Sequence, residues 1–203
     1  METKSKITPE ESLKIISDTI LKNSKAIERS ALNHSLLWGI LVVFTAMVVG
    51  HLWEHNGGPI WNMLWFAMTI VGIVFERLLF KNKPKMPQSH LTSIFMLFGK
   101  IIGAFCIVLF IAVLLAVNLI PYNAAMMMSY AMASFIIIIF GYYASVTGYI
   151  MRNKIVIALG IFSGTFGTIA AMLVEGSYKM LVIAAVAFLT MVLPYFIKKY
   201  GER

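Results

Sequence analysis

Charged residues are scarce in this chain and cysteine is nearly absent, and the scarcity of charge excludes most soluble architectures. Of 203 residues, 13% are charged and 60% are apolar, and the mean hydropathy is +0.83. A water-soluble fold cannot bury so large an apolar share. The single cysteine, Cys106, cannot form an intrachain disulfide, and its place inside an apolar stretch predicts ordinary apolar packing.

Patterns for the common catalytic and nucleotide-binding sites are also missing. The chain has no glycine-rich phosphate loop, no Walker pattern, no serine nucleophile elbow and no paired-cysteine motif. No charged residue lies near the centre of an apolar stretch, where ion pathways usually place them. These absences favour a non-enzymatic protein without a cofactor.

What the chain does have is six apolar stretches. Each approaches the roughly 20 residues that cross a bilayer of about 30 Å, and the second does so when it is extended to Phe80. The stretches are 36–53, 60–75, 101–120, 122–151, 155–174 and 180–197. We therefore predict an all-α, polytopic bundle of six transmembrane helices in a lipid bilayer.

The basic residues predict how this bundle is oriented. The links 54–59, 121–123 and 175–179 between apolar stretches contain one basic residue, Lys179. The other 16 of the 17 Lys and Arg residues lie at the chain ends or beside the remaining links. Because cytoplasmic segments carry the excess of Lys and Arg, both chain ends are predicted to be cytoplasmic. The net charge of +8 follows from this orientation and from attraction to anionic headgroups, so direct nucleic-acid binding is not expected.

The predicted spans divide the chain into an N-terminal segment, residues 1–34, a six-span domain, residues 35–198, and a short cytoplasmic tail, residues 199–203. Because hydrophobicity begins only at Leu36, no cleavable signal peptide is expected. Thr8 and Glu11 predict a capping box with Pro9 in the first helical turn. At 100° per residue the helix is amphipathic. Its apolar face comprises Leu13, Ile16, Ile20, Ile27 and Ala31, and its basic face comprises Lys14, Lys22, Lys25 and Arg29.

Two interpretations of this amphipathic helix stay open. In the first, its apolar face lies on the inner leaflet, as in interfacial helices, or against the cytoplasmic ends of the bundle. Alternatively, Leu13, Ile16, Ile20 and Ile27 anchor a cytosolic protein, or a second copy in a homo-oligomer. A long coiled coil is not expected, since Asn23 and Ser24 interrupt the heptad spacing.

Small residues in the fifth stretch predict a close helix contact. Gly160, Gly164, Gly167 and Ala171 form a strip against which another helix can pack. The same strip would suit a solute path, so a carrier or channel for a small neutral or lipophilic solute is an alternative function. At the cytoplasmic ends of the second and third stretches, Glu76 and Lys100 either pair with each other or snorkel to the interface.

One catalytic pattern requires a separate hypothesis. His51, Glu54 and His55 match H-x-x-E-H, in which two histidines bind Zn²⁺ and the glutamate activates a water. Glu175 is the other acidic residue on the outer side and would supply a third ligand. A zinc-dependent membrane hydrolase is therefore a second alternative. The structural interpretation, which we favour, is an interfacial helix end followed by a turn.

The runs 11–17 (ESLKIIS) and 35–39 (SLLWG), with Trp61, Leu64 and Trp65, resemble an uncharacterised family of small bacterial multi-span inner-membrane proteins. The resemblance implies a bacterial inner membrane, no known enzymatic activity and pairing with a soluble DNA-binding regulator, and it supplies no catalytic residues. The leading hypothesis is a regulatory or scaffolding protein of the inner membrane that couples to a cytosolic partner through its N-terminal helix.

Overall fold

Helices make up nearly all of the chain that the structure describes. The computed structural model describes residues 8–56, 59–81 and 122–201 and single positions between 97 and 115. Every regular element within these residues is helical, which confirms the all-α prediction. The elements are α1 (Pro9–Asn56), the 3₁₀ helix η1 (Pro59–Met63), α2 (Leu64–Phe80), α4 (Tyr122–Ile150), α5 (Lys154–Leu173), α6 (Tyr178–Ala187), the π-helix η2 (Phe188–Val192) and α7 (Leu193–Gly201).

Five helical segments are long and apolar enough to cross a membrane, and they confirm a multi-span protein. They are Glu28–Asn56, Ile60–Phe80, Ala131–Ile150, Lys154–Leu173 and Tyr178–Tyr200, the last running through α6, η2 and α7. They coincide with five of the six predicted stretches. The third stretch, 101–120, lies largely outside the described residues, and the positions described within it are helical.

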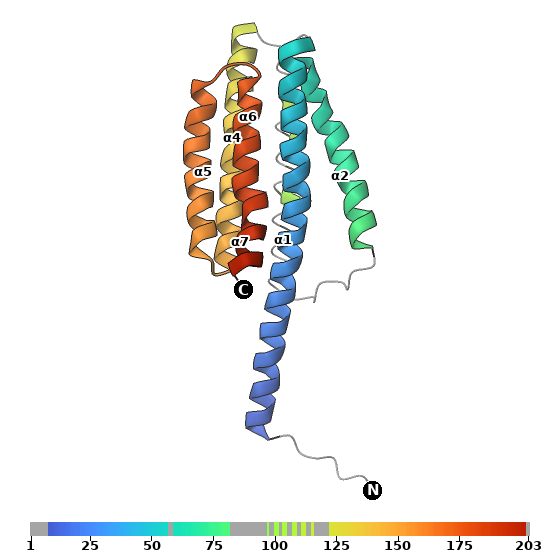
Figure 1. Ribbon diagram of the computed structural model, residues 1–203, viewed down its shortest axis with the longest axis vertical. Coiled ribbons are helices and arrows are strands. Elements are labelled where there is room, and N and C mark those ends of the chain that lie inside the picture. The colour runs from blue at the N-terminus through green and yellow to red at the C-terminus, as the bar shows by residue number, and fades with distance from the viewer. Residues whose placement is uncertain are drawn as a thin grey trace.

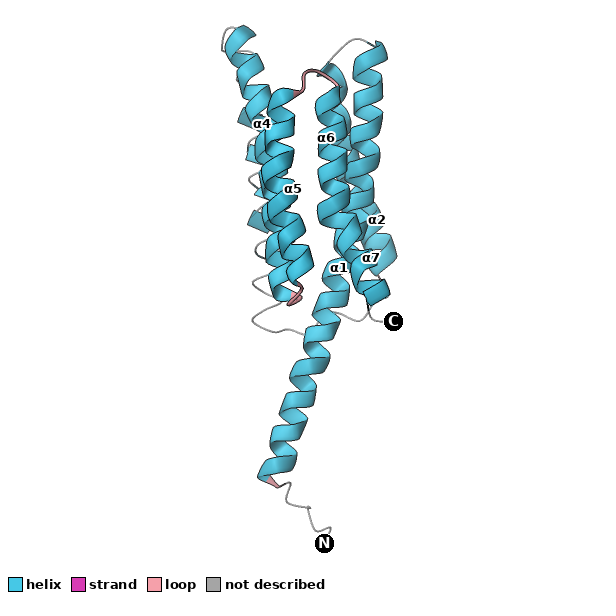
Figure 2. Cartoon of the chain, turned by 60° about the vertical axis from the view of Figure 1, so that its left-hand side comes forward, coloured by secondary structure: helices cyan, strands magenta, loops and turns pink. Residues whose placement is uncertain are grey.

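The helices run side by side, with α1 and α5 in one direction and α2, α4 and α6 to α7 in the other (Figures 1 and 2). Both chain ends lie at one end of the bundle. We call it the basic end, because it carries Arg77, Lys81, Arg152, Lys198 and Lys199. The opposite, distal end carries Glu54 and Glu175. Helix α2 ends at the basic end, and α4 begins at the distal end (Figure 1).

The core forms where α1, α4, α5 and α6 meet. Val49, Ile137, Ala171 and Ala187, one from each helix, are fully buried and belong to one apolar cluster. Helix α2 packs on the outside of α1 (Figure 1). Only 6% of its most apolar membrane-spanning stretch is buried, compared with 39% in α1. Among the described residues, α2 is therefore the least buried of the membrane-spanning helices.

Helix α1 continues without a break from the projecting segment into the first span. Its 48 residues correspond to about 72 Å of helix. The predicted capping box is confirmed at its start: the Glu11 N–H donates to Thr8 Oγ1 at 3.2 Å, and the Thr8 N–H donates to Glu11 Oε2 at 3.0 Å. No Gly or Pro lies between Pro9 and Gly39, so nothing in the backbone favours a kink. The first turns of α1 stand clear of the bundle (Figure 2).

Small residues bring α4 and α5 into backbone contact. A Cβ atom added to Gly141 would lie 2.6 Å from Gly164 Cα and 2.7 Å from the Gly160 carbonyl oxygen. Gly167 is covered instead by side chains, Val186 of α6 and Ile137 of α4. The strip of Gly160, Gly164, Gly167 and Ala171 thus lies against two neighbouring helices, and all four residues are buried.

A π-helical turn interrupts the last span, and Pro194 accounts for its position. The Leu193 N–H donates to the Phe188 carbonyl, five residues back. Pro194 has no N–H to continue the ladder, and it is fully buried. The widened turn packs on α1: the Ser35 hydroxyl donates to the Met191 carbonyl at 3.1 Å, and a Cβ on Gly39 would lie 2.7 Å from Met191 Cβ.

Candidate functional site

The H-x-x-E-H motif lies at the distal end, in the last turns of α1. The rings of His51 and His55 stand 4.3 Å apart, centroid to centroid, tilted by 32°. His55 Nδ1 lies 2.9 Å from the His51 carbonyl oxygen, so one nitrogen of His55 is engaged with its own helix. His51 and Glu54 line a cavity of about 190 Å³ together with Ser177 and Tyr178.

Glu175 lies in the turn between α5 and α6. It comes two residues before Ser177, which lines this cavity, but Glu175 itself does not line it. Within the described part of the chain, no three His, Cys, Asp or Glu side chains are close enough to hold a metal ion. A zinc site built from His51, His55 and Glu175, with Glu54 as base, stays a prediction.

The projecting segment of α1 exposes apolar side chains. Leu13 is 67% exposed and Ile15 is 56% exposed, and the basic residues Lys14, Lys25 and Arg29 are exposed too. The side chains of Ile16, Ile20 and Ile27 lie outside the described part. Where α1 enters the bundle, Glu28 pairs with Lys198 at 2.8 Å, and Ala31 and Leu32 are buried. The free part of the helix therefore ends at about Glu28.

A second polar cluster lies near the basic end, between α1 and α2, and sequence reasoning missed it. Glu76 Oε1 lies 3.1 Å from His34 Nδ1, and the Trp38 indole N–H donates to Glu76 Oε2 at 3.2 Å. The His34 ring stacks on Phe80 with centroids 4.2 Å apart. Each carboxylate oxygen of Glu76 thus has a partner on α1, and the pair of helices is fixed in register there.

Gly72 allows this contact, since a Cβ at that position would lie 2.6 Å from the Trp38 ring. The absence of a side chain lets the indole cross α2 and reach the carboxylate one turn further along. Glu76 therefore neither pairs with Lys100 nor simply snorkels: its partners are His34 and Trp38.

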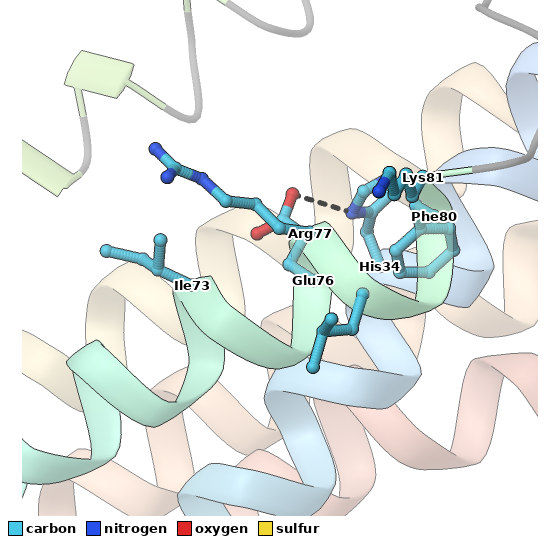
Figure 3. A pocket seen from close by; sticks show the side chains of 7 residues that line it. His34, Ile73, Glu76, Arg77, Phe80 and Lys81 are labelled. Atoms are coloured by element: carbon cyan, nitrogen blue, oxygen red, sulfur yellow. Dashed lines mark ion pairs between the residues drawn. The ribbon is translucent and has the colours of Figure 1, made fainter.

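An open groove of about 760 Å³ surrounds this cluster. Its polar lining residues are His34, Glu76, Arg77 and Lys81, and its apolar ones are Ile73, Leu78 and Phe80. Figure 3 shows Glu76 turned toward His34 while Arg77 extends away from that pair. Arg77 and Lys81 are exposed, and neither forms an ion pair with another described residue.

The sequence contains the residues of this cluster, but predicting their contact requires knowing how the first two spans align as an antiparallel hairpin. Glu76 is the one acidic residue between Glu54 and Glu175, and a short link joins the first two apolar stretches. An antiparallel pair of helices joined in this way brings the start of the first stretch next to the end of the second, where His34 and Glu76 lie. The 3₁₀ helix η1 (Pro59–Met63) lies in the link between the two helices.

No family model matches the chain, and no curated protein or solved structure is significantly similar to it. The resemblance to a family of small bacterial inner-membrane proteins therefore stays a prediction. What the chain can do must be argued from its own geometry.

Proposed function

We propose that this multi-span membrane protein is a non-enzymatic regulator or scaffold, and that it recruits a cytosolic protein through the projecting segment of α1. The observation that carries the proposal is the continuity of α1. One helix holds both a membrane span and a free segment on which Leu13 is 67% exposed.

The direction of α1 argues against the segment lying flat on the membrane. An interfacial helix lies in the plane of the bilayer with its apolar face in the headgroups. The segment from Pro9 to Glu28 instead prolongs the first span away from the bundle (Figures 1 and 2). At 1.5 Å per residue it reaches about 28 Å beyond the point where α1 enters the bundle. Leu13 is thereby carried away from the lipid.

The apolar stripe continues the face of α1 that is buried in the bundle. At 100° per residue, Leu13 falls on the same side of the helix as Ala31, Val42 and Val49, and those three residues are buried. A partner that covers Leu13 would therefore sit below α4 to α7, close to the exposed cations Arg152 and Lys199. This surface fits a protein with an apolar groove and an acidic rim.

The cytosolic side is inferred from charge. The basic end carries the excess of Lys and Arg that marks cytoplasmic segments, and we assign the protein to a bacterial inner membrane on the resemblance of its first 80 residues. The projecting segment then lies in the cytoplasm, where a soluble regulator can reach it.

Site-specific photocrosslinking tests this proposal with a control on the same helix. A crosslinking amino acid replaces either Leu13 or Ile15 in the full-length chain, expressed in its own host. The two positions have similar exposure, 67% and 56%, but lie about 160° apart around the helix. We expect a discrete protein adduct from position 13 and a much weaker one from position 15. The adduct from position 13 should be lost when Ile20 is also changed to Asp.

Three results would count against the proposal. Equal adducts from both positions would indicate contact without a specific face. Lipid adducts alone would place the segment on the membrane, and an adduct of twice the chain mass would identify a second copy as the occupant.

A further inference from the structure

The groove between α1 and α2 combines features that suit a lipid headgroup and a lipid tail. It lies in the last two turns of the α2 span, at the basic end. Its cations Arg77 and Lys81 are exposed. Beside them the apolar side chains Ile73 and Leu78 are also open, at 44% and 68% exposure. The groove therefore presents cations where headgroups lie, with Ile73 one turn further toward the bilayer core and Leu78 between the two cations along α2.

We propose that this groove binds one anionic phospholipid of the leaflet at the basic end, with the lipid phosphate held by Arg77 and Lys81. The two residues are four apart on α2, which places their Cβ atoms about 6 Å apart on one face of the helix. Both side chains can then reach a single phosphate group. Basic pockets between membrane helices commonly hold acidic headgroups in this way.

Glu76 does not cancel this attraction. Arg77 and Lys81 carry two positive charges against one negative charge on Glu76. Moreover, the Glu76 carboxylate is held on the α1 side of the groove by His34 and Trp38, at 3.1 and 3.2 Å. Figure 3 shows Arg77 extending away from that pair. The cations are thus left to face the surrounding lipid.

The proposal also explains how an outlying helix is held in place. Within the described part of the chain, α2 is 6% buried over its membrane-spanning residues and packs mainly on α1. A phospholipid that contacts Arg77 and Lys81 while its chains cover Ile73 and Leu78 would fill the open side of the helix pair.

Native mass spectrometry of the full-length protein in detergent tests the site. Phosphatidylglycerol and phosphatidylcholine are titrated separately, and inorganic phosphate is added in excess as a competitor. The test variant is Arg77→Gln with Lys81→Gln. The matched control is Arg152→Gln with Lys154→Gln, which removes two exposed cations from the same end of the bundle.

The wild type should bind one phosphatidylglycerol more tightly than phosphatidylcholine, and inorganic phosphate should not displace it. A cation near the membrane surface contributes about fivefold in affinity, so the test variant should lose roughly 25-fold. The control should stay within about twofold of wild type, and the swap of Arg77→Lys with Lys81→Arg should retain most of the binding.

The proposal fails if the test variant binds phosphatidylglycerol within about twofold of wild type. It also fails if the control loses as much, because the attraction would then belong to the whole basic end. Displacement by inorganic phosphate would show that a free anion, and not a lipid, is the ligand.

Discussion

Replacing Gly141 by valine should destabilise the bundle by about 3 kcal/mol, at the upper end of what overpacking usually costs. The three atoms nearest the added Cβ are all backbone atoms, and the two closest are Gly164 Cα at 2.6 Å and the Gly160 carbonyl oxygen at 2.7 Å. A flexible side chain can turn aside, but a helix backbone cannot, so α4 and α5 would have to separate along their length. The measurement is the denaturant dependence of unfolding in detergent, followed by tryptophan fluorescence and circular dichroism.

Gly103→Val is the control, because a Cβ at Gly103 meets nothing within 4 Å. Both variants share the same small gain in helix propensity, because valine is a better helix former than glycine. Their difference therefore isolates the contact between α4 and α5. If the two variants unfold within about 0.5 kcal/mol of each other, which is the size of ordinary surface effects, the close approach at Gly141 is not what holds this helix pair.

Replacing Ala26 by proline should break α1 below the bundle while the bundle stays folded. Proline removes one backbone hydrogen bond and clashes with the carbonyl four residues earlier, which costs about 3 kcal/mol in a helix interior. Ala26 is exposed and lies before the Glu28–Lys198 ion pair. The break should therefore disconnect the projecting segment without disturbing the buried part of α1. Crosslinking at Leu13 should be lost, since the apolar stripe no longer faces the underside of the bundle.

Spin labels at Lys14 and Arg29 measure the break directly. A continuous helix separates these backbone positions by about 22 Å and should give a narrow distance distribution. Ala26→Pro should broaden it, whereas Ala26→Gly, which keeps the N–H and costs about 1 kcal/mol, should leave it narrow. A wild-type protein with an already broad distribution would contradict the unbroken α1.

The spans could be predicted from sequence because lipid imposes a simple requirement, a run of apolar residues long enough to cross it. The capping box at Thr8 and Glu11 was equally local, and the structure confirms it. The π-turn at η2 was not predictable from hydropathy. Pro194 marks a lost hydrogen bond, but whether the chain kinks, ends or widens there depends on what packs beside it, here Ser35 and Gly39 of α1.

The candidate sites also divide into features that follow from local sequence and contacts that depend on how the helices pack. The stripe at Leu13 follows from helical periodicity alone, but its direction depends on whether α1 bends at the membrane surface, and the sequence does not determine that. The contact of His34 and Trp38 with Glu76 joins residues 42 and 38 positions apart. It depends on how α1 and α2 are offset and on the missing side chain of Gly72. Such contacts need the three-dimensional register of the hairpin.

Labelling from one side of the membrane tests the central claim, that both chain ends and the projecting helix share the cytoplasmic side. In a Cys106→Ala background, single cysteines replace Glu175 at the distal end or Lys14 on the projecting segment, and both positions are exposed. A membrane-impermeant maleimide should label position 175 in intact cells and position 14 only after the membrane is opened. Labelling of position 14 in intact cells, with position 175 protected, would contradict the account.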